Sequence, residues 1–280
     1  MKKITRRSFL AAAGLTAAAL ALTACGGSSS STASSAASSV AASSEAASSS
    51  AAAAELATVE AGKLTMATNA AFPPYEMTTD AGDFEGIDIE TAQAIADKLG
   101  LELQIDDMDF DAALLSVQQG KADIAMAGVT VTDERKAVMD FSDSYATGIQ
   151  SIIVPEGSDI TSPDDLAGKK IGTQRGTTGY IYCSDDFGDD AVVAYDDGLT
   201  AVQALNNGQV DAVVIDNAPA KEFVAANPGL VILDTSYAEE DYAIGLAKGS
   251  ALEDAVNAAL EELKADGTLQ SIVDKYITAE

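Results

Sequence analysis

The sequence predicts an α/β protein made of two similarly built lobes. Short apolar segments alternate with longer segments of helical periodicity from about residue 63 onward, and this alternation is typical of helices packed on a mostly parallel sheet. Residues 115–125 also parallel residues 203–213, because each has a helical segment, a glycine, an aspartate and an apolar run in the same order. The parallel predicts a repeated unit, and chance similarity between two common helix–glycine–strand units is the alternative.

The first 24 residues are interpreted as a lipoprotein signal peptide. A basic start and a short apolar run lead to Leu22-Thr23-Ala24-Cys25, which resembles a bacterial lipobox. We expect lipid on Cys25, with an ordinary signal peptide as the alternative; the run is too short for a spanning helix, which needs about 20 apolar residues. Residues 5–10 also resemble a twin-arginine export signal, so this route and the general secretory route both stay open. Residues 25–57, nearly all serine and alanine after the cysteine, predict a flexible tether.

Composition excludes several functions. The chain has 16 basic and 44 acidic residues, a formal charge of -28, and no histidine. Nucleic acid is not expected as a partner, because its phosphates need lysine and arginine. Without histidine the chain lacks the usual general base and zinc ligand, and we expect no metal and no cofactor. Cys183 has no partner once Cys25 carries lipid, so a structural disulfide is not expected and Cys183 is predicted to be inert.

The elements of the first block follow from apolar runs and glycine stops. Strands are predicted at 64–68, 101–105 and 123–126, helices at 89–99 and 112–119, and loops at 69–75 and 108–110. Gly100 and Gly120 close the two helices. The loop at 69–75 contains two prolines and two aromatic residues, which predicts a stiff loop.

The second block repeats this alternation. Strands are predicted at 151–155, 170–173, 191–195, 212–216 and 243–247, and helices at 162–168, after the polar turn 174–179, at 200–207, from Ser250 to about Leu263, and at 268–276. Proline at the first position of the short helix at 162–168 favours its start there. Ser250 and Glu253 have the spacing of a capping box.

Residues 127–136 hold the first candidate for binding. Thr132 has the character of a helix N-cap, followed by acids that the helix dipole favours. Arg135 then lies near free N–H groups, and its planar guanidinium matches a carboxylate with two parallel hydrogen bonds. A small anion is therefore the predicted partner of Arg135, and a surface pair with Asp133 or Glu134 is the alternative.

From about residue 63 to residue 277 the chain resembles the polar amino-acid substrate-binding lipoproteins of ABC importers, bacterial solute-binding protein family 3. The resemblance is carried in order by Ala67-Thr68-Asn69-Ala70-Ala71-Phe72-Pro73-Pro74-Tyr75, Gly86-Ile87-Asp88-Ile89-Glu90, Met108-Asp109-Phe110, residues 127–136, Met139-Asp140-Phe141-Ser142, residues 171–179 and residues 211–217. It implies the two-lobed type II periplasmic-binding fold, with two mixed sheets, a ligand cleft and a two-strand hinge near 145–150 and 240–242. Lobe 1 would span 63–146 and 243–280, and lobe 2 would span 150–239.

The resemblance also implies a site for a zwitterionic amino acid, which needs a cation for its carboxylate and an anion for its ammonium group. The residues expected to bind the ligand are Asn69, Phe72, Tyr75, Phe110, Gly128, Thr130, Arg135, Gln174, Thr177 and Asp216. Arg135, Thr130 and Thr177 would hold the carboxylate, and Asp216 with the Gly128 carbonyl would hold the ammonium group. Phe72 and Phe110 would sandwich the apolar part, with Tyr75 near the rim.

Each of these roles has an alternative. Asp216 and Thr177 could only cap helices, and the two phenylalanines could belong to the core. Many family members have an acid where this chain has Asn69, which weakens a preference for cationic side chains. Arg175 either favours an acidic or polar ligand side chain or points to solvent.

The resulting hypothesis is a binding protein and not an enzyme. We expect a monomer, anchored by lipid to the outer face of the bacterial membrane, that closes around a polar amino acid and delivers it to the transmembrane subunits of an ABC permease. An enzyme of the same fold, similar to cyclohexadienyl dehydratase, is one alternative, with Glu76 or Asp109 as the acid that transfers a proton. A ligand-sensing lipoprotein is the other.

Overall fold

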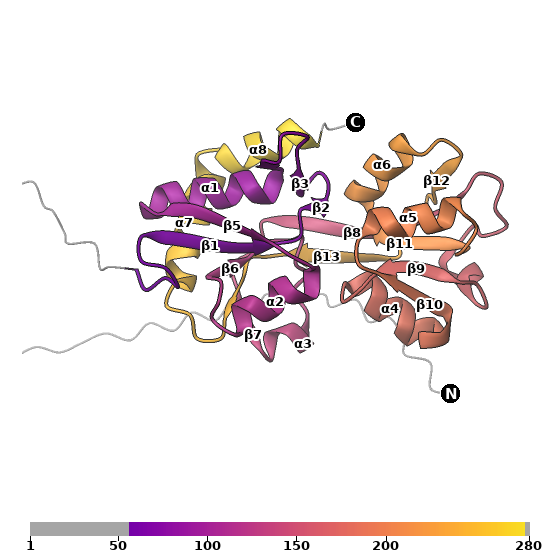
Figure 1. Ribbon diagram of the computed structural model, residues 1–280, viewed down its shortest axis with the longest axis horizontal. Coiled ribbons are helices and arrows are strands. Elements are labelled where there is room, and N and C mark those ends of the chain that lie inside the picture. The colour runs from indigo at the N-terminus through magenta and orange to yellow at the C-terminus, as the bar shows by residue number, and fades with distance from the viewer. Residues whose placement is uncertain (1–55, 278–280) are drawn as a thin grey trace, which may run out of the picture. The chain divides into compact units, whose positions relative to one another are not determined.

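The computed structural model describes residues 56–277. The predicted signal peptide and Cys25 lie outside the described residues. Two mixed sheets, each flanked by helices, organise the described chain, and a small three-stranded sheet of β2, β3 and β4 accompanies the first (Figure 1). The predicted α/β class and two-lobed fold are confirmed.

Lobe 1 is built around a five-stranded sheet in the order β5-β1-β6-β14-β7. Its elements are β1 (Lys63–Thr68), β2 (Ala71–Phe72), β3 (Glu76–Thr78), β4 (Phe84–Glu85), α1 (Ile87–Leu99), β5 (Glu102–Asp107), α2 (Phe110–Gln118), β6 (Ile124–Ala125), α3 (Asp133–Lys136), β7 (Met139–Phe141), β14 (Gly245–Ala247), α7 (Glu253–Ala265) and α8 (Thr268–Tyr276). β1 is parallel to both β5 and β6, while β14 runs antiparallel to β6 and β7.

Lobe 2 is built around a six-stranded sheet in the order β10-β9-β11-β8-β12, with β13 also paired to β8. Its elements are β8 (Ala146–Pro155), a 3-10 turn (Pro163–Leu166), β9 (Ile171–Gln174), α4 (Thr178–Phe187), a second 3-10 turn (Asp189–Ala191), β10 (Val192–Tyr195), α5 (Gly198–Asn206), β11 (Ala212–Asp216), α6 (Asn217–Ala226), β12 (Leu230–Ile232) and β13 (Ala238–Tyr242). β9, β10 and β11 are parallel, so their carboxyl ends share one edge, where α/β sheets place their ligands.

The strands β8 and β13 connect the lobes. They pair antiparallel from Ala238 opposite Gln150 to Tyr242 opposite Ala146. Tyr242 also bridges to Thr130, which ties this connection to the loop after β6. The two-strand connection expected for this fold is therefore present, while the lobe boundaries given above stay predictions.

Several element limits differ from the prediction for identifiable reasons. α2 begins at Phe110, so this side chain lies in the first helical turn and not in a loop. α7 begins at Glu253 without a side-chain cap, so the predicted capping box at Ser250 is wrong; the Ser250 hydroxyl instead accepts the N–H of Leu252. α6 was not predicted, because its start at Asn217 directly follows a strand and its first turn contains Pro219.

Cys183 lies in α4 and is fully buried, as the prediction of an inert residue requires. Burial raises the pKa of its thiol to about 12. The thiol therefore stays protonated, and a protonated buried thiol is a poor nucleophile.

Candidate ligand-binding site

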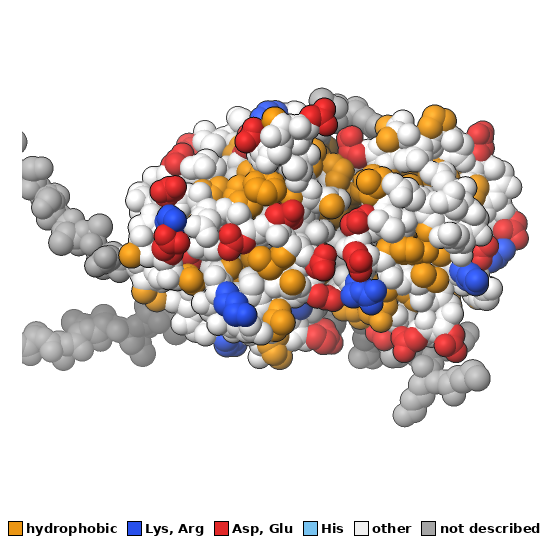
Figure 2. All heavy atoms as spheres, in the orientation of Figure 1, with side chains coloured by type: hydrophobic (Ala, Val, Ile, Leu, Met, Phe, Trp, Pro, Cys, Tyr) orange, Lys and Arg blue, Asp and Glu red, His pale blue; other side chains and the backbone are white. Residues whose placement is uncertain are grey.

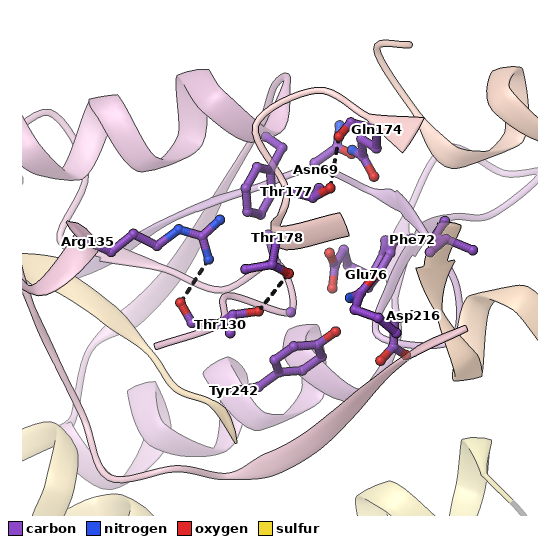
Figure 3. Close-up of a pocket in the computed structure, with 15 residues that line it drawn as sticks. Asn69, Phe72, Glu76, Thr130, Arg135, Gln174, Thr177, Thr178, Asp216 and Tyr242 are labelled. Carbon is purple, nitrogen blue, oxygen red and sulfur yellow. Dashed lines mark hydrogen bonds between the residues drawn. The ribbon is translucent and has the colours of Figure 1, made fainter. Parts of the chain in front are cut away.

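A pocket lies between the two lobes. It is lined by residues of both lobes: Asn69, Phe72, Glu76, Phe110, Ala127, Gly128, Thr130, Arg135, Gln150, Gln174, Thr177, Thr178, Ile215, Asp216 and Tyr242. Nine of the ten predicted site residues are in this set, and Tyr75 is the exception. Figure 3 shows Arg135 and Asp216 on opposite sides of the pocket.

Tyr75 differs from the prediction. It is buried behind the pocket instead of near the rim, with its ring stacked on Phe72 at 5.8 Å and edge-on to Tyr242 at 5.4 Å between centroids. Pro74 and Tyr75 border a second cavity, which residues of α6 also line. Tyr75 therefore supports the aromatic wall and does not line the pocket.

Arg135 is a buried cation without an anionic partner. α3 begins as predicted, with the Thr132 hydroxyl accepting the Arg135 N–H, and this places the side chain 8% exposed beneath the pocket. Its guanidinium donates to the carbonyls of Thr130 at 2.8 Å and Gly176 at 3.1 Å. No carboxylate in residues 56–277 forms an ion pair with it, and burial lowers its pKa. The alternative of a surface ion pair is therefore wrong, and N–H donors remain for another acceptor.

The ring of Phe110 lies against this guanidinium, with 5.3 Å from the charged carbon to the ring centroid. The close approach also depends on Gly176, whose Cβ would meet the Asp111 carboxylate at 1.6 Å. Only a glycine there lets the lobe 2 turn reach both Asp111 and Arg135. The two lobes thus meet at the wall that holds the cation.

Asp216 is the buried acid on the opposite wall. It ends β11 with 2% exposure, and its carboxylate accepts the N–H groups of Ile149 at 2.7 Å and Ala218 at 3.0 Å. The bond to Ala218 caps α6, so the predicted alternative of a capping role holds together with its place in the pocket. Burial raises its pKa to about 6, and no lysine or arginine among the described residues pairs with it.

Asn69 and Gln174 join the lobes over the pocket. The Gln174 amide donates to the Asn69 side-chain oxygen at 2.9 Å, and the Asn69 amide donates to the carbonyl of Met108 at 3.0 Å. Both are buried. Their amide groups are thus already engaged with the protein, a direct contact between lobes that the sequence did not predict (Figure 3).

Glu240 orders a polar network that sequence reasoning missed. Its carboxylate accepts the Thr130 hydroxyl and the Gln150 amide, both at 3.0 Å. The Thr130 oxygen lies 3.4 Å from the hydroxyl of Thr178 in the other lobe. Because Thr130 has one hydroxyl proton and directs it to Glu240, its backbone N–H is the group left to donate into the pocket.

The N-terminus of α4 lies at the same place. Thr177 is its N-cap, accepting the N–H of Tyr180 at 3.4 Å, so the capping reading of Thr177 is correct, although the residue also lines the pocket. The first N–H groups of this helix, beginning with Thr178, have no intrahelical partner and favour an anion. Thr178 lines the pocket but was not predicted as a site residue; its position next to Thr177 in the sequence could have indicated it.

Glu76 is the least expected residue of the pocket. It is 0% exposed, and neither carboxylate oxygen has a hydrogen-bond partner among the described residues. Burial raises its pKa well above the ordinary value, and the neighbouring Asp88 adds to this shift. The sequence suggested Glu76 only as an acid for the enzyme alternative; Asp109, its counterpart there, borders a separate cavity at the lobe boundary.

Two lobes joined by paired strands, with a small polar pocket between strand ends, define a two-lobed solute-binding protein. The family model of bacterial extracellular solute-binding proteins, family 3, matches residues 64–279. The chain belongs to this family, as the sequence indicated.

Known relatives share most of the folded chain. The L-cystine-binding protein TcyJ of Escherichia coli is 33% identical over 226 residues, covering 79% of this chain and 85% of that protein. The arginine-binding extracellular protein ArtP of Bacillus subtilis is 32% identical over 230 residues, covering 78% and 87%. These relatives are solute-binding proteins and not enzymes.

Solved structures agree on the fold. An ancestral arginine-binding protein bound to glutamine has a TM-score of 0.75 and 41% identity, covering 79% of this chain and all of that one. The arginine-, lysine-, histidine-binding protein ArtJ of Geobacillus stearothermophilus has a TM-score of 0.75 and 34% identity, covering 78% and 96%. Across residues 56–277, every helix is too short or too polar to cross a bilayer.

Proposed function

We propose that this protein captures an α-amino acid whose side chain ends in hydrogen-bond donors and delivers it to an ABC permease. The observation that carries the proposal is the pair of opposite charges in one pocket, Arg135 and Asp216, each buried and neither neutralised by a described residue. A buried charge without a partner is costly. A zwitterion that brings a carboxylate to one and an ammonium group to the other offsets both costs.

The backbone of the amino acid fits this arrangement. Its carboxylate would receive the free guanidinium N–H groups of Arg135, the N–H of Thr130 and the first N–H of α4. Its ammonium group would donate to Asp216 and to the carbonyl of Gly128. Gly128 has a φ of 55°, and a Cβ there would meet the Phe72 ring at 2.9 Å, so a glycine lets this backbone border the pocket. Phe72 and Phe110 would cover the apolar stem of the ligand.

Glu76 supports a proposal for the side chain of the ligand. Once Arg135 and Asp216 are paired, the Glu76 carboxyl and the side-chain oxygen of Gln150 are acceptors without a partner on the pocket wall. An amino acid ending in a guanidinium, ammonium, imidazole or amide group supplies donors to the Glu76 carboxyl. Relatives that bind arginine, histidine and glutamine have such ligands.

The surface around the lobe boundary supports a cationic ligand over an acidic one. Acidic side chains gather on both sides of the middle of the face in Figure 2. Arg175, which could have favoured an acidic ligand, does not line the pocket; its side chain is 55% exposed and lies 3.8 Å from Asp196. A negative field of this kind attracts cations.

The remainder of the proposal concerns location and delivery. We infer a lipid anchor on Cys25, a tether over residues 25–57 and closure of the lobes about β8 and β13, on the strength of the lipobox pattern and the family. A Cys25→Ser variant is expected to move from the membrane fraction to the soluble fraction of cells. Unchanged membrane retention would contradict the anchor.

The binding proposal is tested by a thermal-shift screen of residues 58–280 against the twenty amino acids and a few small carboxylates. A ligand at a hundredfold excess over its Kd stabilises the folded state by about 2.7 kcal/mol. We expect a few related amino acids with donor-bearing side chains to raise the melting temperature and to be recovered unchanged. Response to a carboxylate without an ammonium group would overturn the zwitterion assignment, and conversion of a ligand would favour an enzyme.

A further inference from the structure

A second buried acid lies directly behind Glu76. Asp88, in the first turn of α1, is 0% exposed, and its backbone N–H donates to the Tyr75 carbonyl at 2.8 Å. This contact brings the start of α1 against the residue that precedes Glu76. The start of the helix is held there closely, since a Cβ on Gly86 would meet the Tyr75 carbonyl oxygen at 2.2 Å.

Asp88 also reaches the pocket through its neighbour. One carboxylate oxygen accepts the N–H of Gly128 at 3.0 Å, and the other has no partner among the described residues. Gly128 lines the pocket and Asp88 does not. Asp88 is therefore a positioning residue for the Gly128 backbone, while Glu76 faces the ligand space itself.

The surroundings of this acid pair contain no compensating cation. The titratable groups that face Glu76 are Asp88 from α1, Asp107 from β5, and the phenols of Tyr75 and Tyr145. Within residues 56–277, no lysine or arginine forms an ion pair with either acid. Arg135 and Asp216, the charged groups elsewhere on the pocket wall, are assigned to the ligand backbone in the proposed function.

Two adjacent carboxyls away from water cannot both ionise easily. Burial raises the pKa of Asp88 to about 6 and that of Glu76 well above its ordinary value. The backbone N–H of Gly128 favours the charged form of Asp88, whereas Glu76 has no such donor. The proton of the pair therefore resides on Glu76.

We propose that Glu76 and Asp88 share one proton in the empty pocket, and that a ligand with a cationic side chain displaces this proton while a neutral ligand leaves it in place. The displaced proton passes from the Glu76 carboxyl to solvent, and the carboxylate pairs with the ligand cation. A neutral amide instead accepts from, and donates to, the protonated carboxyl. This inference rests on the proposed function and adds how the site distinguishes ligand charge.

Linkage fixes the sign of the pH dependence. Because binding a cationic ligand releases a proton, its affinity rises with pH, by up to about tenfold per pH unit for one proton. The rise continues until the empty site loses its own proton. Asp216 releases a proton on binding as well, since pairing with the ligand ammonium group favours its charged form, but it does so with every amino acid. The difference between a cationic and a neutral ligand therefore isolates the acid pair.

The experiment is calorimetric titration of residues 58–280 with arginine and with glutamine, in buffers of different ionisation enthalpy, from about pH 6 to about pH 8. The dependence of the heat on the buffer gives the protons released per ligand. We expect arginine to release close to one more proton than glutamine near neutral pH. Equal proton release by both ligands overturns the inference and leaves the amino-acid site intact; no binding of either overturns both.

Variants assign the proton to its residue. Glu76→Gln is expected to abolish the extra proton release and to reduce arginine affinity at least tenfold while glutamine still binds. Asp88→Asn, whose side-chain oxygen still accepts the Gly128 N–H, is expected to reduce the release, because Glu76 no longer has a negative neighbour. Glu85→Gln on β4 is the matched control, an exposed acid of the same small sheet, and should change nothing. Wild-type proton release in Glu76→Gln overturns the inference.

Discussion

The α2–β6 unit of lobe 1 and the α5–β11 unit of lobe 2 have the same internal construction. Each helix is followed by a glycine at positive φ, Gly120 at 65° and Gly208 at 68°. The next residue donates to a carbonyl five residues back, at 2.8 Å in lobe 1 and 2.9 Å in lobe 2. The aspartate that follows accepts a backbone N–H next to it in space: Asp123 accepts that of Thr65 in β1 at 2.8 Å, and Asp211 accepts that of Lys170, directly before β9, at 2.7 Å.

The two units differ where their strands end. β11 places the acid Asp216 at its last position, whereas β6 leads into a neutral loop, and the charged group of that wall, Arg135, follows several residues later. The repeated part of each unit sets where the strand end lies. The residue that ends or follows the strand sets the charge that the pocket receives from that lobe.

The largest expected effect comes from the lobe 1 charge. Arg135→Ala should remove detectable amino-acid binding, because loss of one member of a buried charge pair costs about 3 to 5 kcal/mol. Arg175→Ala is the matched control, an arginine at the lobe boundary that is 55% exposed, and should bind within about twofold of the parent. Calorimetry measures both. Near-native affinity of the Arg135 variant would refute the role of Arg135 as the carboxylate partner.

The lobe 2 charge is tested next by Asp216→Asn. Asparagine keeps the cap of α6 but loses the negative charge, so binding should weaken by about 2 to 3 kcal/mol while the helix stays intact. Asp197→Asn is the control, since Asp197 caps α5 in the same way, accepting the N–H of Thr200, but does not line the pocket. If both variants lose affinity equally, the effect belongs to helix capping and the comparison between the lobe ends fails.

We also expect Asp216→Asn to change how the free energy of unfolding of the ligand-free protein depends on pH. The pKa of Asp216 is raised from 3.8 to about 6 in the folded state, so the folded protein binds more protons than the unfolded chain between these values. Its contribution to stability is present at low pH and is lost as pH rises toward 6, by about 3 kcal/mol in total. Urea unfolding at about pH 4 and about pH 7 should show Asp216→Asn gaining about 2 to 3 kcal/mol relative to the parent. An unchanged difference would mean that Asp216 is not destabilised by burial.

The sequence predicted the features that depend on local pattern and missed those that depend on long-range contacts. The alternation of strands and helices, the Thr132 and Thr177 caps and the strand end at Asp216 depend on local pattern, and they are present as predicted. Glu240 and Glu76 depend on which segments meet in three dimensions. From the sequence, a glutamate on a strand is expected to face solvent, whereas the fold brings Thr130 and Gln150 to Glu240.

Tyr75 illustrates the same boundary for an aromatic residue. The loop composition predicted that two aromatic side chains lie near the site. Which of them lines the pocket depends on Tyr242, which contacts Tyr75 and follows it by 167 positions in the sequence (242 − 75). Asn69 was predicted as a ligand contact and lines the pocket, and the sequence did not predict that its amide also bonds to Gln174 and Met108. Partners that are distant in the sequence set the surroundings of both residues.

The smallest expected effect comes from the bond that joins the lobes without any charge. Asn69→Ala and Gln174→Ala each remove the 2.9 Å hydrogen bond across the pocket, which should weaken binding by about 0.5 to 1.5 kcal/mol, mainly through faster ligand release. Gln203→Ala, on the exposed face of α5, is the control and should leave the release rate unchanged.

A double-mutant cycle separates this bond from separate contacts of each amide with the ligand. If the two amides act through each other, the second substitution adds almost nothing to the first, and the coupling is close to the single effect of about 1 kcal/mol. If each instead contacts the ligand, the two losses add. Additive losses would mean that each amide contacts the ligand separately, whereas coupling would mean that the hydrogen bond between Asn69 and Gln174 stabilises the closed form by itself, before the charges of Arg135 and Asp216 are satisfied.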